Sequence, residues 1–238
     1  MIGFFRKIRK KLADDNKPLK YMRYAIGEIV LVMFGILLAL QVNNWNEERK
    51  DREKEQKVLE TLAYNLERNS ILLHEALGRV EELNKSGKIV FNFFEGKETF
   101  HDTLDNHFNL GKRNGVMQGI ISHEGYENYK NAGFDIILSD AIKTNVLHLF
   151  EVEYPHLEAY RQLLVMLTNK SSVYDLIWTQ HFRNNKPINI INLLKSNEMY
   201  EMFRVAQSTR SILTVELNKA LDNTEKVLQL IKEEIGKE

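Results

Sequence analysis

The chain has 238 residues, with twelve glycines, three prolines and no cysteine, and its 33 basic and 33 acidic residues balance. The lack of cysteine excludes disulfides, thiolate metal sites and thiol nucleophiles. Few glycines and prolines together with 28% charged residues favour helices over an all-β fold. We therefore expect an all-α protein.

Residues 1–23 are predicted to be a basic cytoplasmic segment. They contain eight basic and two acidic residues, a net charge of +6. Apolar and basic residues alternate irregularly over residues 1–12, a pattern that can lie on an anionic membrane surface. The alternative is that these charges only set membrane topology.

Residues 24–45 are predicted to be a transmembrane helix, in which Glu28 is the only charged residue. The 19 residues 24–42 give roughly 28 Å of helix, close to the hydrocarbon thickness of about 30 Å. Tyr24 and Trp45 place aromatic rings at the two ends, where membrane interfaces favour them. The basic flank and these rings argue against a buried core helix.

A cleaved signal peptide is the nearer alternative, because its apolar region also follows basic residues. Such a region usually spans about 7 to 15 residues and ends in an Ala-x-Ala-like site. Here Ala39 is followed by Leu40, Gln41 and Val42, which do not complete that site. We expect the segment to remain as an anchor.

One face of the predicted span carries its polar and small residues. At about 100° per residue, Gly35 and Ala39 lie within roughly 20° of Glu28, and Val32 lies near them. Small residues four apart allow two helices to approach closely, and a central charge facing lipid costs roughly 2.5 kcal/mol or more. We expect self-association, or packing on a partner span, through Glu28, Val32, Gly35 and Ala39. The alternative is that Glu28 reaches the inner headgroups and the glycine is incidental.

Residues 46–57 are predicted to be a charged helical stalk, with a disordered linker as the alternative. Residues 47–57 contain five acids and five bases, some at the helical i,i+4 spacing. The basic flank before the span therefore places the N-terminus in the cytoplasm and the rest of the chain outside. Residues 24–238 sum to −6, which disfavours nucleic acid as a partner.

Residues 58–238 are predicted to form an antiparallel helical bundle, beginning with a long amphipathic helix. Gly87 is expected to interrupt this helix. Asn69 falls within its apolar seam, where it either fixes the register or faces solvent at the bundle edge. The seam steps by three and four through Leu59, Leu62, Leu66, Asn69, Leu73, Ala76, Val80 and Leu83.

The middle of the chain is the least regular. Residues 97–123 read as a long excursion with one short helix, and residues 124–132 as a short helix stopped by Gly133. Ser139 is a good N-cap for a long helix that Pro155 should kink. The seam of that helix is Ile142, Val146, Leu149, Leu157, Tyr160, Leu164, Leu167, Tyr174 and Trp178.

A turn at residues 184–187 precedes the last amphipathic helix, which Ser196 or Asn197 should cap. Its apolar face is Met199, Phe203, Ala206, Leu213, Leu217, Ala220, Val227, Ile231 and Ile235.

Two short motifs contain residues that could carry chemistry. Glu153 and His156 form a Glu-x-x-His pair, but di-iron bundles need two such motifs and two further carboxylates. The glycine-rich sequence at residues 111–115 lacks the spacing of a P-loop and its terminal Ser or Thr. We therefore predict no catalytic, cofactor-binding or metal-binding residue, and no enzyme.

The sequence from Tyr24 to Asn46 closely resembles that of a family of single-span membrane proteins of Bacteroidota, domain-of-unknown-function family 6090. The family's basic N-terminal pattern is present at Phe4–Arg9, and a later motif is echoed more loosely at Tyr126–Ile142. The resemblance implies an inner-membrane protein whose large domain lies in the periplasm. It carries over no catalytic residue.

These features favour a membrane-anchored structural or adaptor protein whose partners are the lipid bilayer and either a second copy or another membrane protein. The alternative is a periplasmic ligand-sensing module that acts through a partner protein, because some 20 cytoplasmic residues provide no output domain.

Overall fold

The computed structural model describes residues 18–111, 113, 119–168 and 171–236, and these are almost entirely helical. Most of the predicted basic segment 1–23, including Phe4–Arg9, lies outside the described residues. The helices are α2 (Pro18–Phe94), α3 (Leu104–Gly111), α4 (Glu124–Ala132), α5 (Asp140–His148), α6 (Tyr154–Thr168), α7 (Ser171–His181), α8 (Ile190–Lys195) and α9 (Asn197–Ile235). A 3₁₀ turn, η1 (Phe134–Ile136), and a π-helical turn, η2 (Leu149–Glu153), complete the helical elements.

The chain divides into two compact units, one up to Lys54 and the other from Glu55 to the C-terminus. Helix α2 contributes to both, and residues 46–57 are helical within it. Glu55 is buried, and its carboxylate accepts a 2.6 Å hydrogen bond from the backbone N–H of Leu138. Glu55 is therefore the first residue of α2 that packs within the second unit.

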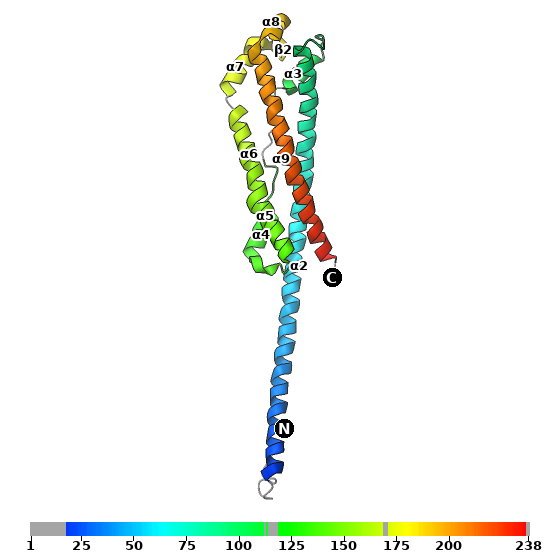
Figure 1. Ribbon diagram of the computed structural model, residues 1–238, viewed down its shortest axis with the longest axis vertical. Coiled ribbons are helices and arrows are strands. Elements are labelled where there is room, and N and C mark those ends of the chain that lie inside the picture. The colour runs from blue at the N-terminus through cyan, green and yellow to red at the C-terminus, as the bar shows by residue number, and fades with distance from the viewer. Residues whose placement is uncertain (1–17, 112, 114–118, 169–170, 237–238) are drawn as a thin grey trace. The chain divides into compact units, whose positions relative to one another are not determined.

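The second unit is an antiparallel bundle of α2, the α5–α7 segment and α9 (Figure 1). Three core clusters show the directions of these elements, because each joins residues from all three. Along α2 the clusters run from Leu59 to Phe93, while along α9 they run in reverse from Ile231 to Met199. The α5–α7 segment runs from Ile142 to Trp178 in the same direction as α2. The predicted all-α antiparallel bundle is confirmed.

The seam predicted for the first bundle helix is buried throughout, with every member no more than 8% exposed. The predicted interruption at Gly87 is wrong, since α2 continues unbroken to Phe94. A side chain at Gly87 would collide with the guanidinium of Arg210, which fills the space beside the helix. The glycine therefore serves a close approach between helices.

The expected kink at Pro155 takes the form of a π-helical turn. Proline lacks the N–H that would bond to the carbonyl of Glu151. In η2 the N–H of Tyr154 instead donates to the carbonyl of Leu149, five residues back. Pro155 then falls in the first turn of α6, where a missing N–H costs little. The long helix predicted here runs from α5 through η2 and α6 to Thr168, and α7 begins at Ser171 after residues 169–170, which lie outside the described residues.

The predicted caps and turn are confirmed. Ser139 accepts a hydrogen bond from the N–H of Ile142, and Ser196 accepts one from the N–H of Met199 at 3.2 Å. At the turn, β1 (Phe182–Arg183) pairs with β2 (Lys186–Pro187) in a hairpin. Its two loop residues have positive φ, a conformation that asparagine tolerates, as a type I′ turn requires; they are Asn184 and Asn185. The two short strands were not predicted.

Candidate membrane anchor and buried polar sites

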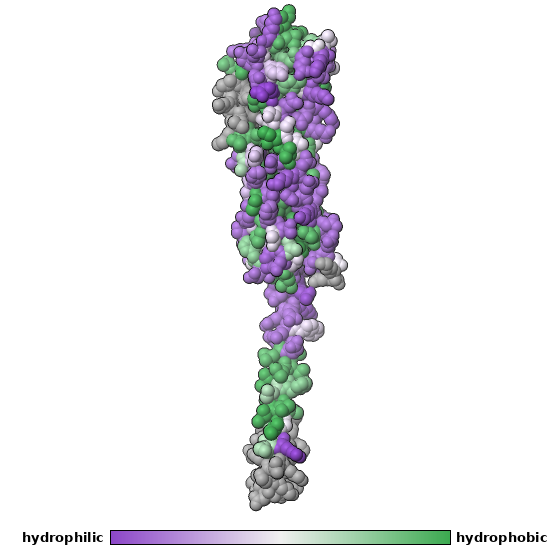
Figure 2. Space-filling view, viewed as in Figure 1, coloured by the Kyte–Doolittle hydropathy of each residue, from purple (hydrophilic) through white to green (hydrophobic). Residues whose placement is uncertain are grey.

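The apolar part of α2 in the first unit is uncovered. It is long and apolar enough to cross a membrane, and none of its most apolar 18-residue window is buried. Its large apolar side chains from Ile29 to Leu40 are 52–68% exposed, whereas the seam residues of the same helix in the second unit are buried. Figure 2 shows this stretch as a band of hydrophobic surface followed by a hydrophilic one. A soluble core helix would not leave such a band exposed.

Three of the four residues of the predicted packing face are uncovered. Val32 is 54% exposed, Ala39 is exposed, and a Cβ built on Gly35 would meet nothing within 4 Å. Glu28 is half-buried. In the described part of the chain the small residues of this face are therefore free to take a second helix.

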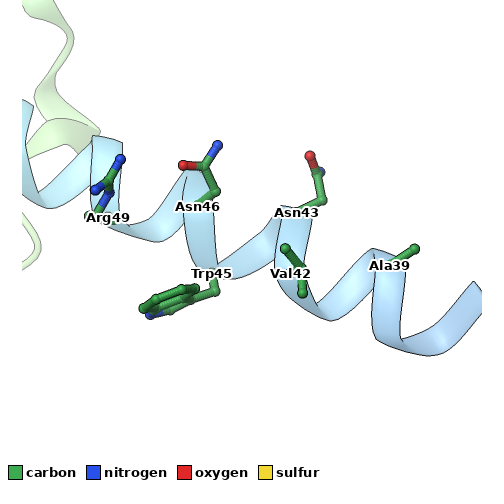
Figure 3. Close-up of a pocket in the computed structure, with 6 residues that line it drawn as sticks. All are labelled: Ala39, Val42, Asn43, Trp45, Asn46 and Arg49. Atoms are coloured by element: carbon green, nitrogen blue, oxygen red, sulfur yellow. The ribbon is translucent and has the colours of Figure 1, made fainter. Parts of the chain in front are cut away.

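At the C-terminal end of the apolar stretch the same helix carries a hollow. Figure 3 shows Ala39, Asn43, Asn46 and Arg49 on one side of the helix and Trp45 on the other. The Nδ2 of Asn43 donates a 3.1 Å hydrogen bond to the carboxylate of Glu47. All six lining residues come from this one helix, so the hollow is a surface feature and not a closed cavity; they are Ala39, Val42, Asn43, Trp45, Asn46 and Arg49.

Glu153 and His156 of the Glu-x-x-His motif form ion pairs with different partners. Glu153 is buried and lies 2.9 Å from the Nζ of Lys219 and 3.8 Å from the Nδ1 of His148. The hydrogen bond to Glu153 raises the pKa of Lys219. His156 instead lies 3.3 Å from the carboxylate of Glu216. The pair thus joins α9 to the neighbouring helices by two separate ion pairs.

Asn69 is fully buried, which excludes the solvent-facing alternative. Its Oδ1 accepts a 2.8 Å hydrogen bond from the N–H of Ser122, and its Nδ2 donates to the carbonyl of the same residue at 3.0 Å. The Nδ2 also lies 3.5 Å from the hydroxyl of Tyr154, which is hydrogen-bonded to Thr224 at 2.8 Å. Burial raises the pKa of Tyr154 to about 12. Asn69 therefore links α2 to α6, α9 and the segment before α4, and so fixes their relative register.

Arg210 is a completely buried charged residue that sequence reasoning missed. Its Nε donates to the Oδ1 of Asn84 at 2.8 Å, and its Nη1 donates to the carbonyls of Gly111 and Arg113 at 2.7 and 2.6 Å. Burial lowers its pKa to about 10. Gly111 and Arg113 of the glycine-rich motif therefore supply acceptors at the end of α3, and the other residues of the motif lie outside the described residues.

A signal for Arg210 was present in the sequence. The apolar face of the last helix steps from Ala206 to Leu213, and residue 210 is the seam position between them. A charge at a seam position is either exposed at the bundle edge or buried with hydrogen-bond acceptors. The periodicity alone cannot decide between these, because the acceptors come from α2 and from the end of α3.

The fold and the uncovered apolar stretch define the class, a helical-bundle domain joined to one helix that can span a membrane. Residues 28–98 match the family model described as a family of unknown function, DUF6090. The match covers the apolar stretch from Glu28 onward and the part of α2 in the bundle, and it confirms the resemblance over these residues. Comparisons with curated proteins and with solved structures found no match.

Proposed function

We propose that the protein is a single-pass inner-membrane protein that anchors a periplasmic helical interaction domain and acts as a structural or adaptor component without catalytic activity. The observation that carries the proposal is the uncovered apolar stretch of α2, whereas the apolar seam of the same helix from Leu59 to Leu83 is buried. Anchoring follows because exposing this stretch to water would cost about 25 cal/mol for each Å² of apolar surface.

The proposed orientation places the N-terminus in the cytoplasm, on the basis of the +6 charge of residues 1–23. A reporter that is active only outside the cytoplasm, fused after Glu238, should be active in cells. A cytoplasm-only reporter at the same position is the matched control and should be silent. The opposite pattern would reverse the topology.

We further propose that two copies associate through the face containing Glu28, Val32, Gly35 and Ala39. The lack of native cysteine allows single cysteines to be introduced at Gly35, Ala39 and Leu37. After oxidation in native membranes, disulfide dimers should form at Gly35 and Ala39 but not at Leu37, which lies on the opposite side of the helix. Equal or absent cross-linking at all three positions would reject self-association and leave a different membrane protein as the partner.

The alternative is a ligand-sensing module that acts through a partner, and the buried polar groups between the helices of the second unit favour it. Purification in mild detergent from the native membrane would identify a stable partner protein. A thermal-shift screen of the purified chain with metals and metabolites tests for a ligand. Stabilisation by a small molecule would favour the sensor, whereas a protein that co-purifies without any such stabilisation favours the adaptor.

A further inference from the structure

The uncovered part of α2 keeps a regular heptad spacing that continues beyond its apolar stretch. Over residues 28–53 one face of the helix, called here the heptad face, advances by alternating steps of four and three residues. Its eight positions are Glu28, Val32, Gly35, Ala39, Val42, Asn46, Arg49 and Glu53. This is the spacing of the a and d positions of a coiled coil, with Asn46 at an a position and Val42 and Arg49 at d positions. Such a repeat keeps one face turned towards a neighbouring helix as the two wind around each other.

The hollow on α2 has the lining of two consecutive coiled-coil holes (Figure 3). In a parallel pair of helices, each a or d side chain inserts into a hole formed by four residues of the facing helix. With both helices in the same register, the hole for a d side chain at position 42 is formed by Ala39, Val42, Asn43 and Asn46. The hole for an a side chain at position 46 is formed by Val42, Trp45, Asn46 and Arg49. Together these are the six residues that line the hollow, so a second copy of α2 in register would fill it with its own Val42 and Asn46.

The heptad face is uncovered where the hollow lies. Val42 is 63% exposed, and Asn46 is half-buried. Two d positions of the same repeat further along the helix, Ala63 and Ser70, are buried in the second unit. The chain therefore buries these later positions with its own helices, whereas the part of the face before Glu55 is open to a second molecule.

The polar residues of the heptad face are complementary to themselves. An asparagine side chain contains both a donor and an acceptor, so two copies of Asn46 that face each other can exchange hydrogen bonds. A single asparagine at an a position specifies the register and the number of strands of a coiled coil. Arg49 and Glu53 follow at the next d and a positions and lie 3.7 Å apart within one helix. In a parallel pair Glu53 helps to form the hole for the opposite Arg49, so each arginine would also meet a glutamate of the other copy.

We propose that two copies of the chain form a parallel, in-register coiled coil through residues 28–53 of α2, with the two Asn46 side chains hydrogen-bonded to each other. The parallel arrangement rests on the proposed anchoring, because two copies in one membrane enter it in the same direction. The coiled coil extends the proposed contact at Gly35 and Ala39 beyond the apolar stretch and fixes its register. A contact made only by these small residues would leave the helices free to cross and diverge after the apolar stretch.

The test is disulfide cross-linking of single-cysteine variants of the full chain in native membranes. Retention of the chain in carbonate-washed membranes is checked first, so that a failure of the anchoring is recognised separately. We expect disulfide dimers in Val42→Cys and Arg49→Cys, at d positions, and none in Asn44→Cys and Asp51→Cys, which lie on the opposite side of the helix. Equal or absent cross-linking at all four positions would overturn the proposal. If cysteines at positions 35 and 39 cross-link while those at 42 and 49 do not, the coiled coil is refuted and the proposed self-association within the span stands.

A pair of isosteric variants tests the role of Asn46. In the Val42→Cys background, Asn46→Asp places two carboxylates against each other at neutral pH and should reduce cross-linking several-fold. Asn44→Asp makes the same chemical change two residues away on the opposite side of the helix, and should cross-link like the Val42→Cys parent. Equal cross-linking in the two aspartate variants would contradict the pairing of Asn46.

Discussion

At the scale of single residues, the bundle is distinguished by polar side chains inside an apolar seam. Asn69 and Arg210 both lie at seam positions, are fully buried, and bond to backbone groups of the connection between α3 and α4. In a non-helical segment the backbone N–H and C=O groups lack the hydrogen bonds that a helix would provide. Burying these groups without other hydrogen-bond partners is costly. The two side chains supply partners from α2 and α9.

Replacing Asn69 by alanine should therefore destabilise the fold. The substitution removes both hydrogen bonds to Ser122 and should lower the free energy of unfolding by about 1 to 3 kcal/mol. Asn218 is the matched control, because it is exposed and its Nδ2 bonds only within its own helix. Asn218→Ala should change stability by less than about 0.5 kcal/mol. Chemical denaturation followed by circular dichroism measures both, and equal effects would refute the role of Asn69.

Tyr154 gives the bundle a defined alkaline sensitivity. Burial raises the pKa of its hydroxyl from 10.0 to about 12, so the folded state favours the neutral form. This contribution to stability is fully present below pH 10 and is lost as the pH rises towards 12. The wild type should lose about 2 to 3 kcal/mol more than Tyr154→Phe over this range. Parallel losses in denaturation curves of the two proteins between pH 9 and 12 would contradict the assignment.

At the scale of elements, the α5–η2–α6 segment shows how a proline is accommodated inside a long helical run. The π-turn gives the N–H of Tyr154 a partner five residues back and places Pro155 in the first turn of the next helix. Tyr154 and Glu153 are buried on either side of this junction. The turn therefore sets which side chains of α6 face α9.

Because the missing N–H is already accommodated, Pro155→Ala should change the free energy of unfolding by less than about 1 kcal/mol. Ala159→Pro places the same ring at an exposed site inside α6 and should cost about 3 kcal/mol or more. Thermal and chemical denaturation of both variants provide the comparison. A large loss of stability in Pro155→Ala would show that the proline itself maintains the π-turn.

At the scale of the whole molecule, the two units use the same helix for different purposes. In the first unit the apolar stretch of α2 is exposed. In the second unit three consecutive core clusters join α2 to α9 and to the α5–α7 segment. A single continuous helix can serve both because its exposed residues change from apolar to charged after Trp45.

The second unit should fold without the first. A fragment of residues 55–238 retains all three core clusters and is expected to be soluble, with a predominantly helical circular dichroism spectrum. A control fragment of residues 75–238 lacks Leu59, Leu62 and Leu66, which belong to the first cluster, and should unfold at a lower temperature. A spectrum of the longer fragment dominated by strand or coil would contradict the independence of this unit.

The sequence by itself determined the features that depend on neighbouring residues along the chain. The apolar stretch, the buried seam from Leu59 to Leu83, the caps at Ser139 and Ser196 and the turn before Pro187 all follow from periodicity or from local hydrogen bonding. Such signals lie within a few residues of the elements that they define, so one sequence is enough to identify them.

Only the tertiary structure decided the features that depend on distant partners. Judged from its neighbours in the sequence, Gly87 is predicted to interrupt the helix. In the structure it lies within the helix and makes room for the side chain of Arg210, 123 residues later in the chain. Asn69 is buried because Ser122 presents both backbone groups to it, and Arg210 is buried because the end of α3 presents carbonyls. Whether a polar group at a seam position lies inside or outside depends on whether another segment satisfies its hydrogen bonds, and periodicity contains no information about that segment.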